Sequence, residues 1–246
     1  TSHPTIRITD VDLAPAVVLQ HDLLELVTGL AELIDGSRLP RLSLPPRYLA
    51  AKLGRGLPAL SGEPIPVPAM AIKPVLFGLC DALAQGGAGD AAQHIRAHLD
   101  ETRMDVGSLL TASLRRDQEA IRTSALHQGL APDLLWLVAE LAISPFAHAL
   151  QRMLFGMLPH DSPLQDALDG WNHGYCPSCG SWPAVAEVVT THRVLRCSFC
   201  AFAWTVPPDR CVYCRAAAPT FTRLVPDTAR PGRRVGAENS ARAWAA

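Results

Sequence analysis

The chain is short of charge, and the charge that it has nearly cancels. Charged residues make up 18% of its 246 residues and the formal net charge is −1, which argues against a generic polyelectrolyte binder. Aromatic residues are also scarce, at 6%, but apolar residues as a group reach 48%. A chain with that apolar fraction can bury a core, so disorder of the whole chain is excluded.

The motifs that usually mark a catalytic site are missing as well. The sequence contains no glycine-rich phosphate loop, no G-x-S-x-G nucleophile elbow and no H-E-x-x-H zinc helix. Cys80 stands on the apolar stripe of a predicted helix, where we expect a buried structural cysteine and not a nucleophile. We therefore expect a protein that is not an enzyme.

No segment has the pattern of a secretory signal or of a membrane helix. Residues 1–12 lack a basic segment followed by a long apolar run. The longest apolar stretch, residues 134–150, contains Glu140, Pro145 and His148 and is shorter than the roughly 20 residues that span a bilayer. We expect a soluble protein with no membrane insertion.

The net charge and the cysteine content of the chain both change near residue 170. Residues 1–170 carry 13 Lys and Arg against 19 Asp and Glu, a net of −6, whereas residues 171–246 carry 9 against 4, a net of +5. Six of the seven cysteines fall between Cys176 and Cys214. We predict two domains, 1–170 and 171–246.

The first of these domains has helical periodicity. Apolar residues recur every three or four positions from Leu19 to Ile34, and similar patterns predict further helices up to Arg152, with a kink at Pro145. Eight prolines between Pro40 and Pro74 predict an extended connector on the surface, with Arg41, Arg47, Lys52 and Arg55 along it. The simplest architecture is a bundle of five or more helices.

The second domain has strand patterns instead. Residues 183–190, 192–197 and 201–206 are short segments of strand composition. Trp182 and Trp204 flank the cysteines, and we expect both to form the small core around the hairpin. The predicted fold is an N-terminal all-α domain followed by a small β metal-binding domain of the zinc-ribbon or rubredoxin-like type.

The cysteines form three C-x-x-C pairs, and the first two have the spacing of a metal site. The first pair is Cys176 and Cys179, and the second is Cys197 and Cys200. The 17 residues between the two pairs fall within the spacing range of known tetrahedral zinc sites. Zinc and iron both accept four thiolates, so either metal is possible. Zinc would be structural, iron would give a redox-active rubredoxin-like centre, and a closed four-thiolate site leaves no position for a reactive water.

The third pair, Cys211 and Cys214, has no further cysteines after it. It has the pattern of the start of a second ribbon, whose metal site is doubtful. His173 and His192 are upstream candidates for its missing ligands. The alternatives are an empty half-site and a site that a partner chain completes.

The order of these pairs resembles a known family. The block Gly174 to Pro183, which reads G-Y-C-P-S-C-G-S-W-P, is followed by L-R-C-S-F-C, by Trp204 and by R-C-V-Y-C ending at Cys214. In this it is similar to the FdhE family of formate dehydrogenase accessory proteins. That family continues to a fourth cysteine pair, which is absent here.

The resemblance implies a cytoplasmic assembly factor. Members of the family bind the catalytic subunit of formate dehydrogenase and support its maturation, without being dehydrogenases. By position, the first metal would be held by Cys176, Cys179, Cys197 and Cys200, and Cys211 and Cys214 would begin a second site. The reducing cytoplasm would keep these thiolates available.

Two different functions remain open from the sequence. The net charge of +5 in residues 171–246 suggests a nucleic-acid-binding zinc ribbon, although its arginines (Arg193, Arg196, Arg210 and Arg215) are scattered, which makes nucleic acid an unlikely partner. A rubredoxin-like or thiol-redox protein would require iron or a reactive cysteine pair.

Overall fold

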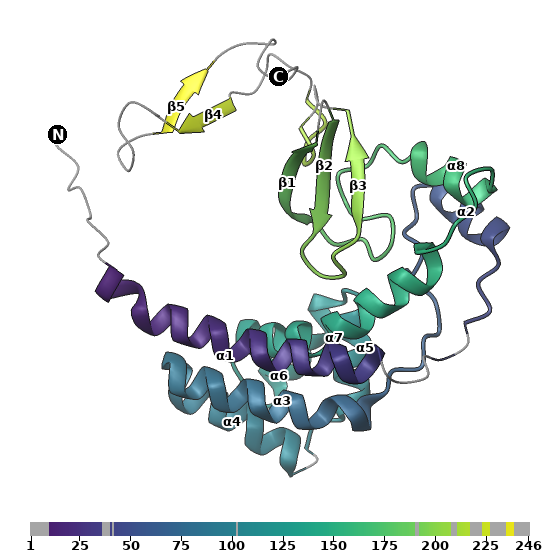
Figure 1. Ribbon diagram of the computed structural model, residues 1–246. Coiled ribbons are helices and arrows are strands. Elements are labelled where there is room, and N and C mark those ends of the chain that lie inside the picture. Colours follow the sequence, from purple (N-terminus) through teal and green to yellow (C-terminus); the bar gives the residue numbers. More distant parts are fainter. Residues whose placement is uncertain are drawn as a thin grey trace. The chain divides into compact units, whose positions relative to one another are not determined.

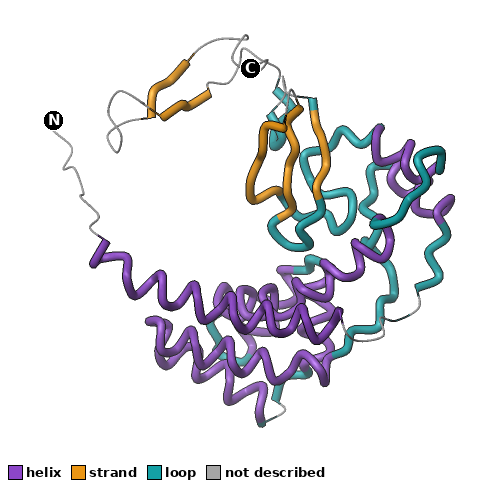
Figure 2. The backbone as a smooth tube through the Cα atoms, in the orientation of Figure 1, coloured by secondary structure: helices purple, strands orange, loops and turns teal. Residues whose placement is uncertain are grey.

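The computed structural model contains two compact units (Figures 1 and 2). It describes residues 10–35, 40, 42–101, 103–189, 192–207, 211–216, 223–226 and 235–238. One unit comprises residues 1–42 and 62–153, and the other comprises residues 43–61 and 154–246. The first is helical, and the second carries the strands, coloured orange in Figure 2. The predicted combination of a helical part and a small β part is therefore confirmed.

The first unit is built from six α-helices and one π-helical turn among its described residues. They are α1 (Asp10–Asp35), α3 (Ala69–Leu83), the turn η1 (Ala84–Ala88), α4 (Gly89–Asp100), α5 (Val106–Leu114), α6 (Gln118–His127) and α7 (Pro132–Phe155). Fully buried side chains, among them Leu30, Leu76, Ile95, Ile143 and Phe146, form its core. The helical periodicity predicted for this region is confirmed.

The long helix α7 is a core element of the first unit. It is long and apolar enough to cross a membrane, but 56% of its most apolar window is buried inside the protein. Two of its polar side chains form ion pairs: Glu140 accepts a hydrogen bond of 2.8 Å from Arg116 in the turn after α5, and Arg152 pairs with Asp35 at the end of α1. This burial is typical of a helix that packs inside a protein core.

The proline-rich stretch is not the extended surface connector that its composition predicted. It contains a helix, α2 (Pro46–Gly54), which packs against α8 (Pro163–Asp169) in the second unit. A proline at the first turn of a helix removes an N–H that would have no intrahelical partner, so Pro46 starts α2 instead of breaking it. Lys52, expected along the surface, is only 4% exposed, and its ammonium donates hydrogen bonds to the carbonyls of Ala59 and Ser61.

The second unit also contains a three-stranded antiparallel sheet. Its strands are β1 (Pro183–Val189), β2 (His192–Cys197) and β3 (Ala203–Val206), in the order β1-β2-β3, and a separate ribbon pairs β4 (Arg223–Pro226) with β5 (Val235–Glu238). Leu195 of β2 lies opposite Trp204 of β3, and both are buried. The compact units place residues 43–61 and 154–170 with this sheet, and the division into independent domains at residue 170 stays a prediction.

Candidate metal centre

Two tight turns bring the first two cysteine pairs to one end of the sheet. The first turn precedes β1: the Cys176 amide donates to Ser181 O (2.8 Å), and the Gly180 amide donates to Cys176 O (2.9 Å). Gly180 has φ +84°, a left-handed conformation that glycine adopts without strain. The second turn joins β2 to β3 and is closed by a 2.9 Å bond from the Cys197 amide to Phe202 O, with Ala201 at φ +57°.

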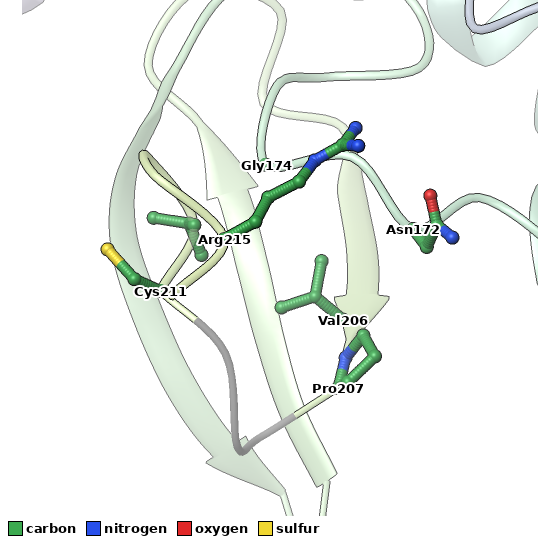
Figure 3. Close-up of a pocket in the computed structure, with 7 residues that line it drawn as sticks. Asn172, Gly174, Val206, Pro207, Cys211 and Arg215 are labelled. Carbon is green, nitrogen blue, oxygen red and sulfur yellow. The ribbon is translucent and has the colours of Figure 1, made fainter. Parts of the chain in front are cut away.

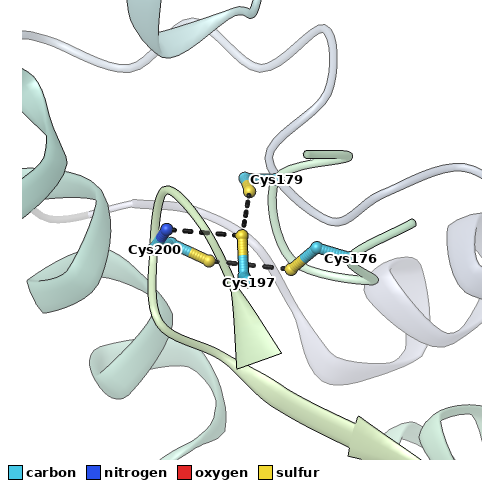
Figure 4. A group of neighbouring side chains, drawn as sticks. All are labelled: Cys176, Cys179, Cys197 and Cys200. Atoms are coloured by element: carbon cyan, nitrogen blue, oxygen red, sulfur yellow. Dashed lines mark hydrogen bonds between the residues drawn. The ribbon is translucent and has the colours of Figure 1, made fainter. Parts of the chain in front are cut away.

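The four sulfur atoms of these turns form a compact group (Figure 4). All four cysteines are buried, and their Sγ atoms lie within 4.8 Å of one another. The Sγ atoms of Cys176 and Cys200 are 3.6 Å apart and those of Cys179 and Cys197 are 3.5 Å apart, far beyond a disulfide bond of about 2.05 Å. Four bonds of about 2.3 Å to a central ion would place tetrahedral sulfurs about 3.8 Å apart. The group therefore has the size of a four-thiolate metal site.

The surroundings of the sulfurs fit a bound cation. The amides of Phe199 and Cys200 both point to the Cys197 sulfur, at 3.3 and 3.4 Å. Hydrogen bonds from the thiols of Cys176, Cys179 and Cys200 lower the pKa of the Cys197 thiol, whereas burial raises the pKa of Cys176. Four buried thiols cannot all ionise together unless a positive ion compensates their charge. The donor set can thus hold a metal ion, and its four positions leave no ligand site open.

The third cysteine pair is not brought into a comparable group. Cys211 is half-buried and Cys214 is exposed, and among the described residues neither belongs to a set of three or more close metal-ligating side chains. The structure therefore gathers four of the six predicted ligands. His173 contacts Arg215 instead of completing this site; burial and that arginine lower the pKa of its ring. The side chain of His192 lies outside the described residues.

The backbone of the third cysteine turn comes very close to the chain just before the first turn. A Cβ atom on Gly174 would lie 1.7 Å from the carbonyl oxygen of Val212, so only glycine fits there. The third cysteine turn is closed by a hydrogen bond of 2.9 Å from the Cys211 amide to the carbonyl oxygen of Ala216. Beside it, residues including Val206, Pro207, Cys211 and Arg215 line a cavity of about 290 Å³ (Figure 3).

Sequence reasoning missed a segment that covers the first cysteine turn. The amides of Ala59 and Leu60 donate hydrogen bonds of 2.8 and 2.9 Å to the carbonyls of Pro177 and Ser178. The Tyr175 hydroxyl donates a third bond, of 2.8 Å, to Gly56 O. Because these partners are far apart in the sequence, no local pattern marks them.

The two tryptophans near the cysteines have different environments. Trp204 is buried, as predicted, and its indole N–H donates to the carbonyl of His173. Trp182 was expected in the core but is 46% exposed, and its ring lies 5.1 Å from that of Tyr213, which is 65% exposed. The small core is completed by Trp171, Leu195 and Phe199.

The fold and the site define a helical protein with a small sheet that carries a buried group of four cysteines. Comparisons with known proteins agree with the family resemblance. A protein named FdhE homolog from Pseudomonas putida is 32% identical over 156 residues, which cover 61% of this chain and 42% of that protein. A second, from Aquifex aeolicus, is 23% identical over 70% of this chain and 54% of its own length. The chain thus spans about half the length of these curated relatives.

The chain was also compared with solved structures and with family models. The crystal structure of the FdhE protein from Pseudomonas aeruginosa matches 85% of this chain and 65% of its own, with a TM-score of 0.47 and 21% sequence identity. No family model matches the sequence. The similarity to the curated relatives confirms the resemblance that the cysteine blocks predicted.

Proposed function

We propose that this chain is a non-enzymatic accessory protein of the FdhE family. It binds the catalytic subunit of formate dehydrogenase in the cytoplasm and supports the maturation of that subunit. The observation that carries the proposal is the buried group of Cys176, Cys179, Cys197 and Cys200, which lies within the sequence blocks that resemble the family. The 32% identity to a protein named FdhE homolog supports the same function.

The metal in this proposal is structural support for a binding surface. Zinc or iron on the four cysteines would join the two turns and hold the Ala59–Leu60 segment that is bonded to the first of them. Cys211 and Cys214 would supply two ligands of a second metal, with the remaining ligands outside the described ranges or on another chain.

An exposed aromatic pair beside the metal centre supports a role in protein binding. Trp182 and Tyr213 are large, rigid and accessible, and aromatic residues of this kind are enriched where interfaces gain most of their affinity. Nucleic acid is a less favoured partner because three arginines of this unit are already engaged: Arg193 contacts Pro207 O, Arg196 pairs with Glu187 and Arg215 contacts His173.

Co-purification tests the proposed function directly. The tagged full chain should retain the formate dehydrogenase catalytic subunit from cells that produce both proteins. A Trp182→Ala/Tyr213→Ala double variant should retain less of it, while a Tyr48→Ala variant, which changes an exposed aromatic residue on α2, should match the wild type. Absence of the subunit from the wild-type eluate would contradict the proposal.

A further inference from the structure

The helical unit contains an open groove that the metal centre does not explain. Helices α1 and α3 pack side by side (Figure 1). A groove of about 560 Å³ runs along them. Apolar side chains, including Leu26, Leu30 and Val75, line it. Gly29 lies on its α1 side, where a Cβ atom would meet no atom within 4 Å, so the groove is open at that position.

The groove is acidic. Asp22 and Glu25 from α1 and Asp81 from α3 line it, and no lysine or arginine is among the described residues that do. Helix α1 as a whole carries six carboxylates and not one lysine or arginine. Arg96 partly offsets this charge, since its Nε lies 3.0 Å from Oδ1 of Asp81. The Nδ1 atom of His21 lies 3.7 Å from Oε1 of Glu25.

Helix α1 also keeps large apolar side chains exposed beside these carboxylates. Leu33 lines the groove and is 56% exposed, and Val17, Val18 and Leu24 of the same helix are exposed as well. Apolar residues next to a row of like charges match a partner that is apolar on one side and oppositely charged at its edges.

We propose that the groove between α1 and α3 binds a positively charged amphipathic helix of the client protein. Apolar side chains of that helix would pack on Leu26, Leu30 and Leu33, and its lysines or arginines would pair with Asp22 and Glu25. A helix lying in a groove between two helices is a common mode of peptide recognition. The proposal rests on the proposed function in that it names the kind of segment the accessory protein holds.

A model peptide tests the groove without formate dehydrogenase. We would measure fluorescence anisotropy of a labelled amphipathic helix of leucine and lysine with the full chain, and of a matched peptide in which glutamate replaces lysine. The lysine peptide should bind, more weakly as salt rises, and the glutamate peptide should not. An Asp22→Asn/Glu25→Gln double variant should lose about tenfold in affinity, as expected for two solvent-accessible charge pairs.

Substitutions at Gly29 test whether the peptide binds in the groove or elsewhere on the surface. Gly29→Trp should fill the groove and abolish binding, whereas Gly29→Ala should leave it open and bind as the wild type does; thermal melting checks that both fold. Glu32→Gln, an exposed carboxylate of α1 outside the lining, is the charge control and should change nothing. Equal binding by Gly29→Trp, or binding of the glutamate peptide, would overturn the proposal.

Two more outcomes distinguish this inference from the proposed function. If the lysine peptide binds in the groove but the formate dehydrogenase subunit does not co-purify, the groove stands and the proposed client is wrong. If the subunit co-purifies equally with the wild type and with Gly29→Trp, the proposed function stands and the groove is not its docking site. A dimer of this chain that Gly29→Trp dissociates would also overturn the proposal, in favour of a second copy as the occupant.

Discussion

The backbone amide of Ala59 donates a 2.8 Å hydrogen bond to the carbonyl of Pro177, inside the first cysteine turn. The neighbouring amide of Leu60 repeats this contact on Ser178. The segment after α2 therefore lies against the backbone that presents Cys176 and Cys179. Because a bound metal would fix that backbone, the metal centre and this segment should stabilise each other.

Removal of the metal should loosen the segment after α2. Without an ion, the four cysteines are no longer linked through a common metal. The turn whose carbonyls accept hydrogen bonds from the Ala59 and Leu60 amides then becomes less ordered. We expect hydrogen exchange at these two amides to accelerate when a chelator removes the metal. The amide of Leu109 in α5, in the other unit, is the internal control and should not change; unchanged exchange at Ala59 would contradict the coupling.

The first cysteine group should bind metal without help from the third pair. Cys176→Ser or Cys197→Ser should reduce the metal that co-purifies with the chain to a small fraction, because a buried tetrahedral site tolerates no missing ligand. Cys214→Ser, at an exposed position, should leave the metal of this site in place. Elemental analysis of each variant measures this and distinguishes zinc from iron. Equal losses in all three variants would contradict the assignment.

A methyl group at Gly174 should disturb the packing of the third cysteine turn. The added Cβ would overlap the carbonyl of Val212, and overpacking of this kind costs about 1–3 kcal/mol. Chemical denaturation should show that Gly174→Ala lowers the free energy of unfolding of this unit. Gly54→Ala is the matched control, since its Cβ would meet no atom within 4 Å, and it should cause no loss.

The helix cap at Asp105 should contribute stability that depends on pH. Its carboxylate accepts a hydrogen bond from the Ser108 amide at the start of α5. Hydrogen bonding to the Ser108 side chain, and then to this amide, lowers the pKa of Asp105. Asp105→Ala should therefore cost about 1 kcal/mol in the free energy of unfolding at neutral pH. The pKa of Asp105 is lower in the folded state than in the unfolded state. The stability that comes from its charge is therefore fully present above the ordinary carboxyl pKa, and it is lost as pH falls through the lowered pKa of the folded state.

Asp105→Asn tests the origin of that pH dependence. Asparagine caps a helix about as well as aspartate but carries no titrating group. The variant should keep most of the stability at neutral pH and lose less of it on acidification than the wild type. An identical acid response in the two proteins would exclude Asp105 as a source.

The parts of the fold that follow local patterns could be predicted from the sequence. The first four cysteines come together because each pair sits in a tight turn and a short hairpin joins the pairs, all of which is set by nearby residues. The helices of the first unit follow from apolar periodicity for the same reason.

Features that depend on distant contacts could not be predicted. Eight prolines indicated an exposed connector, but the burial of Lys52 and the bonds from Ala59 depend on where residues 163–181 lie. The need for glycine at position 174 depends on Val212, and Trp182 contacts the distant Tyr213 at the surface instead of packing in the core. Composition carries no record of such pairs.

The most direct test of the central claim is formate-dependent dye reduction in cells that lack this protein. We predict that activity falls, that the wild-type chain restores it, and that Cys197→Ser restores much less at equal protein level, while Cys80→Ala serves as a control for loss of a cysteine outside the metal centre. Unchanged dye reduction in the deletion strain, with a normally assembled catalytic subunit, would contradict the account.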